Sequence, residues 1–103
     1  MGLTVTLEDE RGVVLGAAVE DPKNLLYGLL PHEDDVSYEL LRYIDPYGDT
    51  TFNQLQIGAF LDEWARVRER ATTEEQYAIV DAIEALAREC LSGVHKYLKF
   101  VGD

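Results

Sequence analysis

Basic and sulfur-containing side chains are scarce in this sequence of 103 residues. Its single cysteine allows no disulfide within the chain, which excludes a disulfide-stapled scaffold. Nine Lys and Arg residues stand against 20 Asp and Glu residues, so the formal net charge is −11. Because such a surface repels phosphate, we expect neither nucleic acid nor a membrane as a direct partner. The partner class that this charge attracts is a basic protein.

Long apolar runs are also missing. No segment approaches the roughly 18 apolar residues of a membrane-spanning helix. The first residues, Met1 to Thr4, contain neither the basic region nor the apolar block of a secretory signal, so we expect a cytoplasmic protein. Hydrophobic residues make up 47% of the chain, which is too many for a disordered tail, and the length suits one domain over residues 1–103.

The negative charge is concentrated in the first half of the chain. Residues 1–50 contain 11 acids and three bases, a net charge of −8, whereas the remaining residues contain nine acids and six bases, a net charge of −3. Acidic clusters occupy residues 8–10, 20–21 and 33–35. This asymmetry places a surface for a basic partner in the N-terminal half, and the alternative is that the charge serves solubility alone.

Three segments of the first half match strand or helix patterns. Apolar and polar residues alternate over residues 3–7, which predicts a half-buried strand. Residues 13–19 predict its return strand, and because both faces are apolar we expect this strand to be covered on both sides. A short helix is expected to begin at Asp21 and to end before residue 31. Residues 37–45 predict a third strand.

Two long helices are predicted in the second half. Thr51 with Gln54, and Thr72 with Glu75, match the capping-box pattern, so we expect helices from these points to about residue 70 and about residue 92. A tight turn between them makes an antiparallel hairpin. Its apolar stripes are Ile57, Phe60, Trp64, Val67 and Ala71 on one helix and Ile79, Val80, Ile83, Leu86, Ala87, Cys90 and Leu91 on the other.

The element order is therefore β-β-short α-β-α-α-β, with a last strand over residues 97–101. This order predicts a two-layer α+β fold, in which an antiparallel sheet of about four strands carries the long antiparallel helical hairpin on one face. Trp64 and Ile83 should face each other inside the hairpin.

Metal and catalytic signatures are weak. His32 and the three acids that follow it have the composition of a cation site, but neighbouring loop residues cannot all point at one ion, so we expect a solvated loop and no metal. Cys90 falls on an apolar helix face, where an inert thiol is expected. His95 has no partner in a nucleophile motif. We therefore expect neither a cofactor nor a catalytic set.

Two stretches resemble a known group of proteins. The first runs from Tyr43 to Asn53 and includes Asp45-Pro46-Tyr47-Gly48-Asp49-Thr50-Thr51-Phe52-Asn53. The second runs from Tyr97 to Asp103. They are similar to small, acidic bacterial proteins that look like immunity proteins of toxin–immunity systems. The resemblance covers about eighteen residues and implies a toxin-neutralising role, but it carries no catalytic residues to this chain.

These observations favour a non-enzymatic, acidic protein-binding domain, with an immunity protein as the specific form of that hypothesis. Carboxylates would steer a basic partner, and tyrosine would supply a desolvated contact. One alternative is a small enzyme or ligand-binding domain that uses the turn from Asp45 to Asp49. Another is a homodimer or larger homo-oligomer with a structural role. The residues predicted to bind the partner are Glu33, Asp34, Asp35, Asp45, Tyr47 and Asp49.

Overall fold

The computed structural model describes residues 2–102, and Asp103, the end of the second stretch above, lies outside them. Its elements, in chain order, are β1 (Thr4–Asp9), β2 (Val19–Glu20), the 3-10 turns η1 (Leu25–Gly28) and η2 (Leu41–Tyr43), β3 (Asp49–Asn53), α1 (Gln54–Arg70), α2 (Glu74–Ser92) and β4 (Lys96–Val101).

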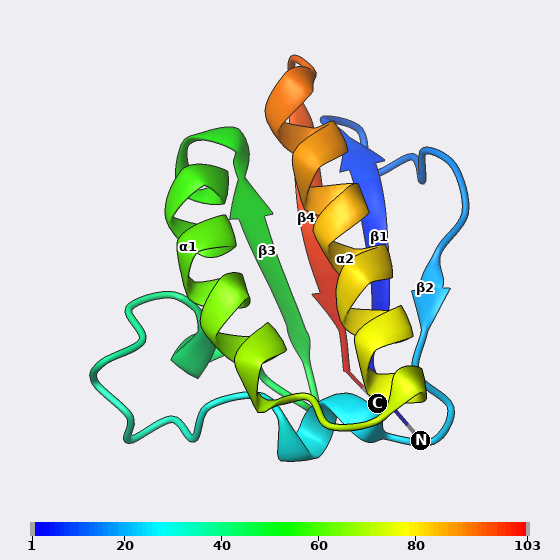
Figure 1. Cartoon of the computed structure of the whole chain (residues 1–103). Coiled ribbons are helices and arrows are strands. Elements are labelled where there is room, and N and C mark those ends of the chain that lie inside the picture. Colours follow the sequence, from blue (N-terminus) through cyan, green and yellow to red (C-terminus); the bar gives the residue numbers. More distant parts are fainter. Residues whose placement is uncertain (1, 103) are drawn as a thin grey trace.

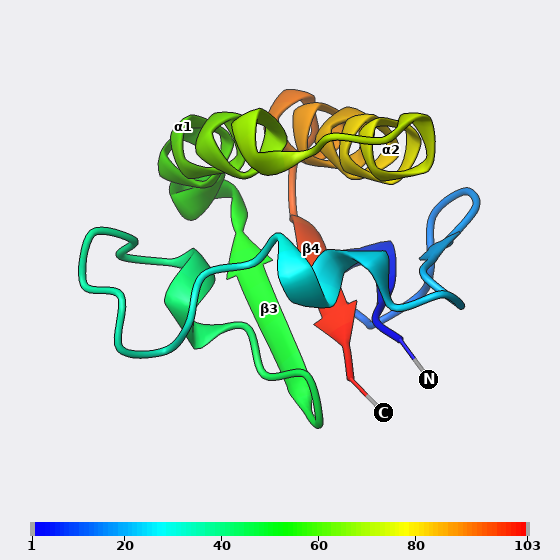
Figure 2. The same ribbon diagram turned by 60° about the horizontal axis from the view of Figure 1, so that its bottom comes forward.

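The described strands form one antiparallel sheet in the order β2-β1-β4-β3 (Figure 1). The first and last strands pair along their full lengths at its centre, from Thr4 opposite Val101 to Asp9 opposite Lys96. Both long helices lie in a second layer on one face of the sheet (Figure 2). The predicted α+β architecture, an antiparallel sheet with a helical hairpin on one face, is confirmed.

The core lies between these two layers. Alternate residues of the central strands point toward the helices and are fully buried, as the period of two requires. Trp64 and Ile83 are both inaccessible to solvent, so the prediction that both are core residues of the hairpin is confirmed. The indole Nε1 of Trp64 donates a hydrogen bond to the carbonyl of Val80 at 3.0 Å, so α1 is joined to α2 inside the core. Aromatic rings fill the layer between helices and sheet: Phe52, Phe60, Trp64 and Phe100.

The first long helix begins two residues later than the capping-box pattern predicts. Thr51 does not cap it, because Thr51 is a strand residue opposite Lys99 in the β3–β4 pair. The capping box is instead formed by Asn53 and Gln56: the Asn53 side chain accepts from the Gln56 amide, and the Gln56 side chain accepts from the Asn53 amide. Pairing with β4 therefore extends the strand past the predicted cap.

The second helix begins one residue later than predicted. Its capping box joins Thr73 and Gln76, not Thr72 and Glu75. The Thr72 amide still donates to the Gln76 side chain at 2.8 Å, so this glutamine holds two successive amides of the interhelical turn. The hairpin prediction stands with this shift of one residue.

The predicted third strand over residues 37–45 is wrong. This segment contains the turn η2, and three of its backbone amides are satisfied by a side chain from α1 rather than by a neighbouring strand. The Glu63 carboxylate accepts from the amides of Glu39, Leu40 and Leu41 at 3.0–3.2 Å. Because one carboxylate supplies the acceptors, the segment folds as a tight turn and the sheet recruits residues 49–53 instead.

The predicted return strand over residues 13–19 is also largely wrong. Only Val19–Glu20 pairs as a strand, with one isolated bridge between Glu8 and Val14. Gly16 has a φ of +74°, which breaks the extended path and directs the chain away from β1. The segment is exposed rather than covered on both faces, since Val14 keeps 48% of its surface.

The short helix after Asp21 is a 3-10 turn, not an α-helix. Asp21 nevertheless acts at its start, as predicted. Its carboxylate is 2% exposed and accepts hydrogen bonds from the amides of Leu25 and Leu26, both at 2.8 Å. Asn24 adopts a left-handed φ of 55° just before the turn, which prevents a longer regular helix from starting there.

Candidate partner-binding surface

Negative charge is dense over residues 27–49, which run from the second half of η1 to the first residue of β3 and are here named the acidic connector. It contains six acids and one base, a net charge of −5. It also carries four of the large apolar or aromatic side chains that solvent reaches: Tyr27, Val36, Tyr43 and Tyr47. Figure 2 shows its chain projecting as a wide loop beside the sheet. Negative charge and exposed rings therefore occur in one segment.

The acidic connector is fixed to α1 at two points. Glu63 accepts the three amides at the start of η2, as described above. One helical turn further along, Arg66 donates to the backbone carbonyl of Ser37 at 2.7 Å and lies over the ring of Tyr38, 3.9 Å from its centroid. Tyr38 itself is buried. These contacts join the loop to α1 although little of the loop is regular secondary structure.

The predicted residues 33–35 form the first part of the surface. Glu33 and Asp34 are exposed, as expected of a solvated loop. Asp35 is partly buried, and its carboxylate accepts from the hydroxyl and the amide of Ser37. These hydrogen bonds lower the pKa of Asp35 below the ordinary value, because they favour the charged form. Asp35 thus shapes the loop, whereas the other two carboxylates face solvent.

The turn from Asp45 to Asp49 forms the second part. The Asp45 carboxylate accepts from the Tyr47 amide at 2.8 Å and so shapes the turn, which leaves the Tyr47 ring 76% exposed. The Asp49 carboxylate lies 3.6 Å from the Lys99 ammonium on β4. Asp45 and Asp49 are both exposed.

A close backbone contact fixes this turn against the end of the sheet. The Gly102 amide donates to the carbonyl of Gly48 at 2.6 Å. A Cβ added at Gly102 would lie 2.5 Å from the backbone nitrogen and oxygen of Gly48, so only glycine permits this approach. The turn that presents Tyr47 is therefore anchored to the strand at the centre of the fold.

The structure connects the two parts through η2. Arg42 donates to the carbonyl of Glu33 at 3.1 Å and to the hydroxyl of Tyr43 at 2.6 Å. On the other side of Tyr43, the Thr50 hydroxyl donates to the Tyr43 carbonyl and accepts from the Asp45 amide. A continuous set of contacts therefore runs from the loop at residue 33 to the turn before β3.

Sequence reasoning missed two exposed rings and the residue that organises them. Tyr43 and Tyr27 keep 61% and 67% of their surface, but their patterns suggested a strand and a helix. The signal for Tyr43 was the neighbouring Arg42, which interrupted the apolar face of the expected strand. No local signal linked Glu63 to this segment, because 22 to 24 residues separate the partners.

His95 does not join the turn from Asp45 to Asp49 in a common site. Asp49 lies opposite Val101 at one end of β4, whereas His95 precedes Lys96 at the other end and faces Glu10 at 3.6 Å. Six residues of extended chain separate these ends by about 20 Å. A single substrate group could not contact both side chains.

Among residues 2–102, no group of three or more His, Cys, Asp or Glu side chains is placed to hold a metal ion. None of the helices described has the length and apolarity to cross a membrane.

Cys90 is fully buried, as predicted, and its thiol lies 3.4 Å from the carbonyl of Lys96. Burial raises the pKa of the Cys90 thiol, because the thiolate would lose its hydration. The thiol is therefore held in its unreactive, protonated form.

Comparison of the chain with protein-family models, curated proteins and solved structures gave no match in any of the three.

Proposed function

We propose that the protein is a non-enzymatic acidic domain that binds a basic protein through the acidic connector. The observation that carries the proposal is the coincidence, in residues 27–49, of a net charge of −5 with three exposed tyrosines. Exposed rings of this size are costly to leave in water and are enriched in the contact patches of protein interfaces.

Charge and rings would have separate tasks in this interaction. Glu33, Asp34 and Asp45 are exposed and would attract a basic partner over several ångströms before contact. Tyr43 and Tyr47 would then be desolvated against the partner and slow its release. Because the connector is fixed by Glu63 and Arg66, little ordering entropy would be lost on binding.

The more specific form of the proposal is an immunity protein that neutralises a basic toxin by covering its active site. This form is supported by the resemblance of residues 43–53 and 97–103 to immunity-type proteins. The first of these stretches contains Tyr43, Asp45, Tyr47 and Asp49, which are the exposed residues at the end of the acidic connector.

The test is affinity capture from the native cell, followed by stopped-flow kinetics with the captured protein. The association rate should fall steeply as salt rises, because the screening length shrinks from about 10 Å at 0.1 M to about 3 Å at 1 M. Combined Glu33→Gln and Asp34→Asn substitutions should slow association, whereas Tyr47→Ala should speed dissociation.

A matched control is the combination of Glu69→Gln and Glu89→Gln, which removes two exposed charges from α1 and α2, outside the connector. An association rate that ignores salt, or that responds equally to the control, would refute the electrostatic mechanism. A captured toxin whose activity is unaffected by this protein would refute the immunity role and leave the binding proposal intact.

A further inference from the structure

The outermost strand, β2, has backbone groups that no described residue pairs. The Asp21 amide donates to the carbonyl of Leu3, and the register places Glu20 opposite Thr4 and Val19 opposite Val5. In an antiparallel pair, residues alternate between bonding to the neighbour and pointing away from it. The N–H and C=O of Glu20 therefore point outward from the sheet. Figure 1 shows no element beyond β2 on this side.

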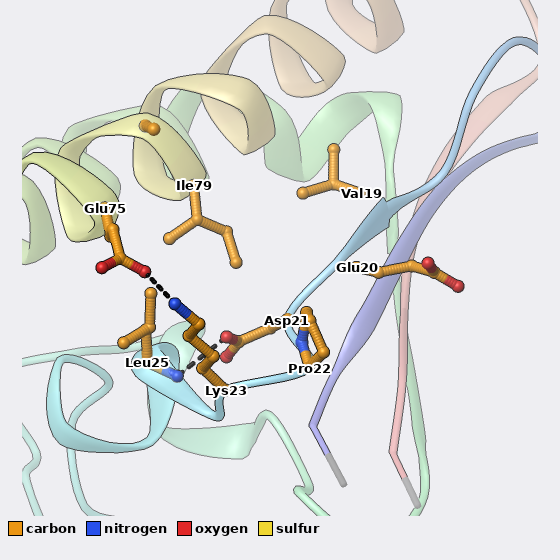
Figure 3. Close-up of a pocket in the computed structure, with 9 residues that line it drawn as sticks. Val19, Glu20, Asp21, Pro22, Lys23, Leu25, Glu75 and Ile79 are labelled. Carbon is orange, nitrogen blue, oxygen red and sulfur yellow. Dashed lines mark hydrogen bonds and ion pairs between the residues drawn. The ribbon is translucent and has the colours of Figure 1, made fainter.

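A hollow lies beside this free edge, on the side of the sheet that carries the helices (Figure 3). Its volume is about 370 Å³, and its walls come from β2, the 21–25 segment and the first turns of α2. The apolar side chains of Val19, Leu25 and Ile79 line it, and Ala78 contributes an exposed methyl group. Volumes of a few hundred cubic ångströms are typical of sites that receive one side chain or a small ligand.

Hydrogen bonds hold one wall of the hollow in place. The buried Asp21 carboxylate accepts the amides of Leu25 and Leu26, so the chain after β2 is tied into η1. Hydrogen bonds to a carboxylate are among the stronger ones in proteins. An incoming side chain would meet a preformed surface and would not have to order it.

The rim of the hollow is acidic. Glu20 is exposed and, in Figure 3, extends away from the hollow toward the other face of the sheet. Glu75 stands on the opposite wall, where it is paired with Lys23 at 2.7 Å. Both partners of this ion pair are more than 60% exposed, so it contributes little stability, and Glu75 already has a cationic partner. The carboxylate that an incoming cation would meet is therefore that of Glu20.

We propose that the edge of β2 and this hollow bind an extended segment of a basic protein as an added strand. Main-chain hydrogen bonds would form to Glu20, as in other cases of strand addition at an open edge. Side chains of an added strand alternate between the two faces, so an aliphatic residue would enter the hollow while its Lys or Arg neighbours lie beside Glu20. The charge of the occupant rests on the proposed function, but the strand edge and the hollow do not.

Charge also decides against a second copy of this chain as the occupant. Each copy has a net charge of −11, and the edge itself carries Glu20 and Glu75. Like charges brought together across such an interface are unfavourable. A basic segment satisfies the same backbone groups and gains from the Glu20 carboxylate.

The probe is a synthetic peptide, acetyl-Thr-Lys-Leu-Lys-Thr-amide, titrated into the ¹⁵N-labelled full chain at low salt. Binding should move the backbone amide signals of Val19, Glu20 and Ala78 and protect the Glu20 amide from hydrogen exchange. Replacing the central leucine of the peptide by alanine should weaken binding about tenfold, since part of the buried hydrocarbon is lost. A peptide with glutamates in place of both lysines should not bind.

Matched variants of the protein separate the hollow from general effects. Ala78→Trp fills the hollow, and Ala85→Trp places the same ring at an exposed position of α2 outside it. Glu20→Gln removes the edge charge, and Glu89→Gln removes an exposed charge elsewhere. The first member of each pair should weaken the peptide at least about fivefold, and the second should leave its affinity unchanged.

Several results would overturn the proposal. They are the absence of shifts at millimolar peptide, shifts that map outside β2 and α2, and equal effects of both members of a variant pair. Shifts of the Glu20 amide that depend on protein concentration alone would assign the edge to a second copy. If Ala78→Trp leaves a captured partner's affinity intact while Tyr47→Ala lowers it, the strand-addition site falls and the proposed function stands. If the peptide binds as expected but no basic protein is captured, the strand-addition site stands and the proposed function falls.

Discussion

Replacement of Glu63 should destabilise the fold and loosen the acidic connector at the same time. Its carboxylate accepts the amides of Glu39, Leu40 and Leu41 and so acts as the cap of η2, supplied from a different element. The bonds to Leu40 and Leu41 are partly buried, so these amides would not be fully hydrated after the carboxylate is lost.

The size of the effect follows from this geometry. Hydrogen bonds to a charged acceptor contribute about 1.5–3 kcal/mol, and loss of a capping side chain costs about 0.5–2 kcal/mol. Because Glu63 is partly accessible to water, we expect Glu63→Ala to cost about 2 kcal/mol. Glu63→Gln keeps one oxygen acceptor and should cost about 1 kcal/mol. In a domain of this size, 2 kcal/mol corresponds to a fall of roughly 8–16 °C in the thermal midpoint.

Urea denaturation and amide hydrogen exchange test this prediction together. The amides of Leu40 and Leu41 should exchange much faster in Glu63→Ala. The amides of the central strands should exchange faster only by the amount that the lower global free energy of unfolding requires. Asp62→Asn is the matched control, since Asp62 is the exposed neighbour on the same helix. An unchanged midpoint with unchanged protection of both amides would refute the capping role.

Four other substitutions test the core, the second cap and one surface ion pair. Trp64→Ala should cost about 3–5 kcal/mol in urea denaturation, because a fully buried ring and its hydrogen bond to α2 are lost. Thr73→Ala should cost about 1 kcal/mol, and Thr72→Ala clearly less, since only Thr73 caps α2. Hydrogen bonding to Arg68 lowers the pKa of Asp81 below its ordinary value of 3.8, so the pair stabilises the fold above pH 4 and this contribution is lost as the pH falls through the lowered pKa. Thermal midpoints measured between pH 2 and pH 6 should therefore vary less in Asp81→Asn than in the unmodified protein.

The parts of the fold that were predicted correctly are those whose signals are local. The stripe through Trp64 and the stripe through Ile83 follow a helical period, and burying them requires a hairpin whatever surrounds it. The alternation over residues 3–7 predicts a strand, and the structure has one there that spans Thr4–Asp9. The capping boxes were displaced by one or two residues, because Thr, Asn and Gln neighbours offer competing caps of similar energy.

The segments that were predicted wrongly have partners distant in sequence. Residues 37–45 have strand-like composition, but the Glu63 carboxylate on α1 accepts hydrogen bonds from backbone amides of this segment. No sequence pattern within the segment predicts that contact. The candidate surface likewise combines residues with a local sequence signal and residues whose position depends on distant contacts. Its carboxylates were visible in the composition, whereas Tyr43 became a surface residue only because its segment left the sheet.

By itself, the amino-acid sequence determined the charge, its concentration in the first half, the helical hairpin and the two-layer α+β class. The tertiary structure decided the strand order β2-β1-β4-β3, the replacement of residues 37–45 by 49–53 as a strand, and the free edge at Glu20. The physical reason is that backbone hydrogen bonds are nearly the same for any pair of strands, so local propensity does not choose between partners. The choice is made by which apolar faces can be buried together and by which distant side chains, such as Glu63, satisfy the backbone that remains.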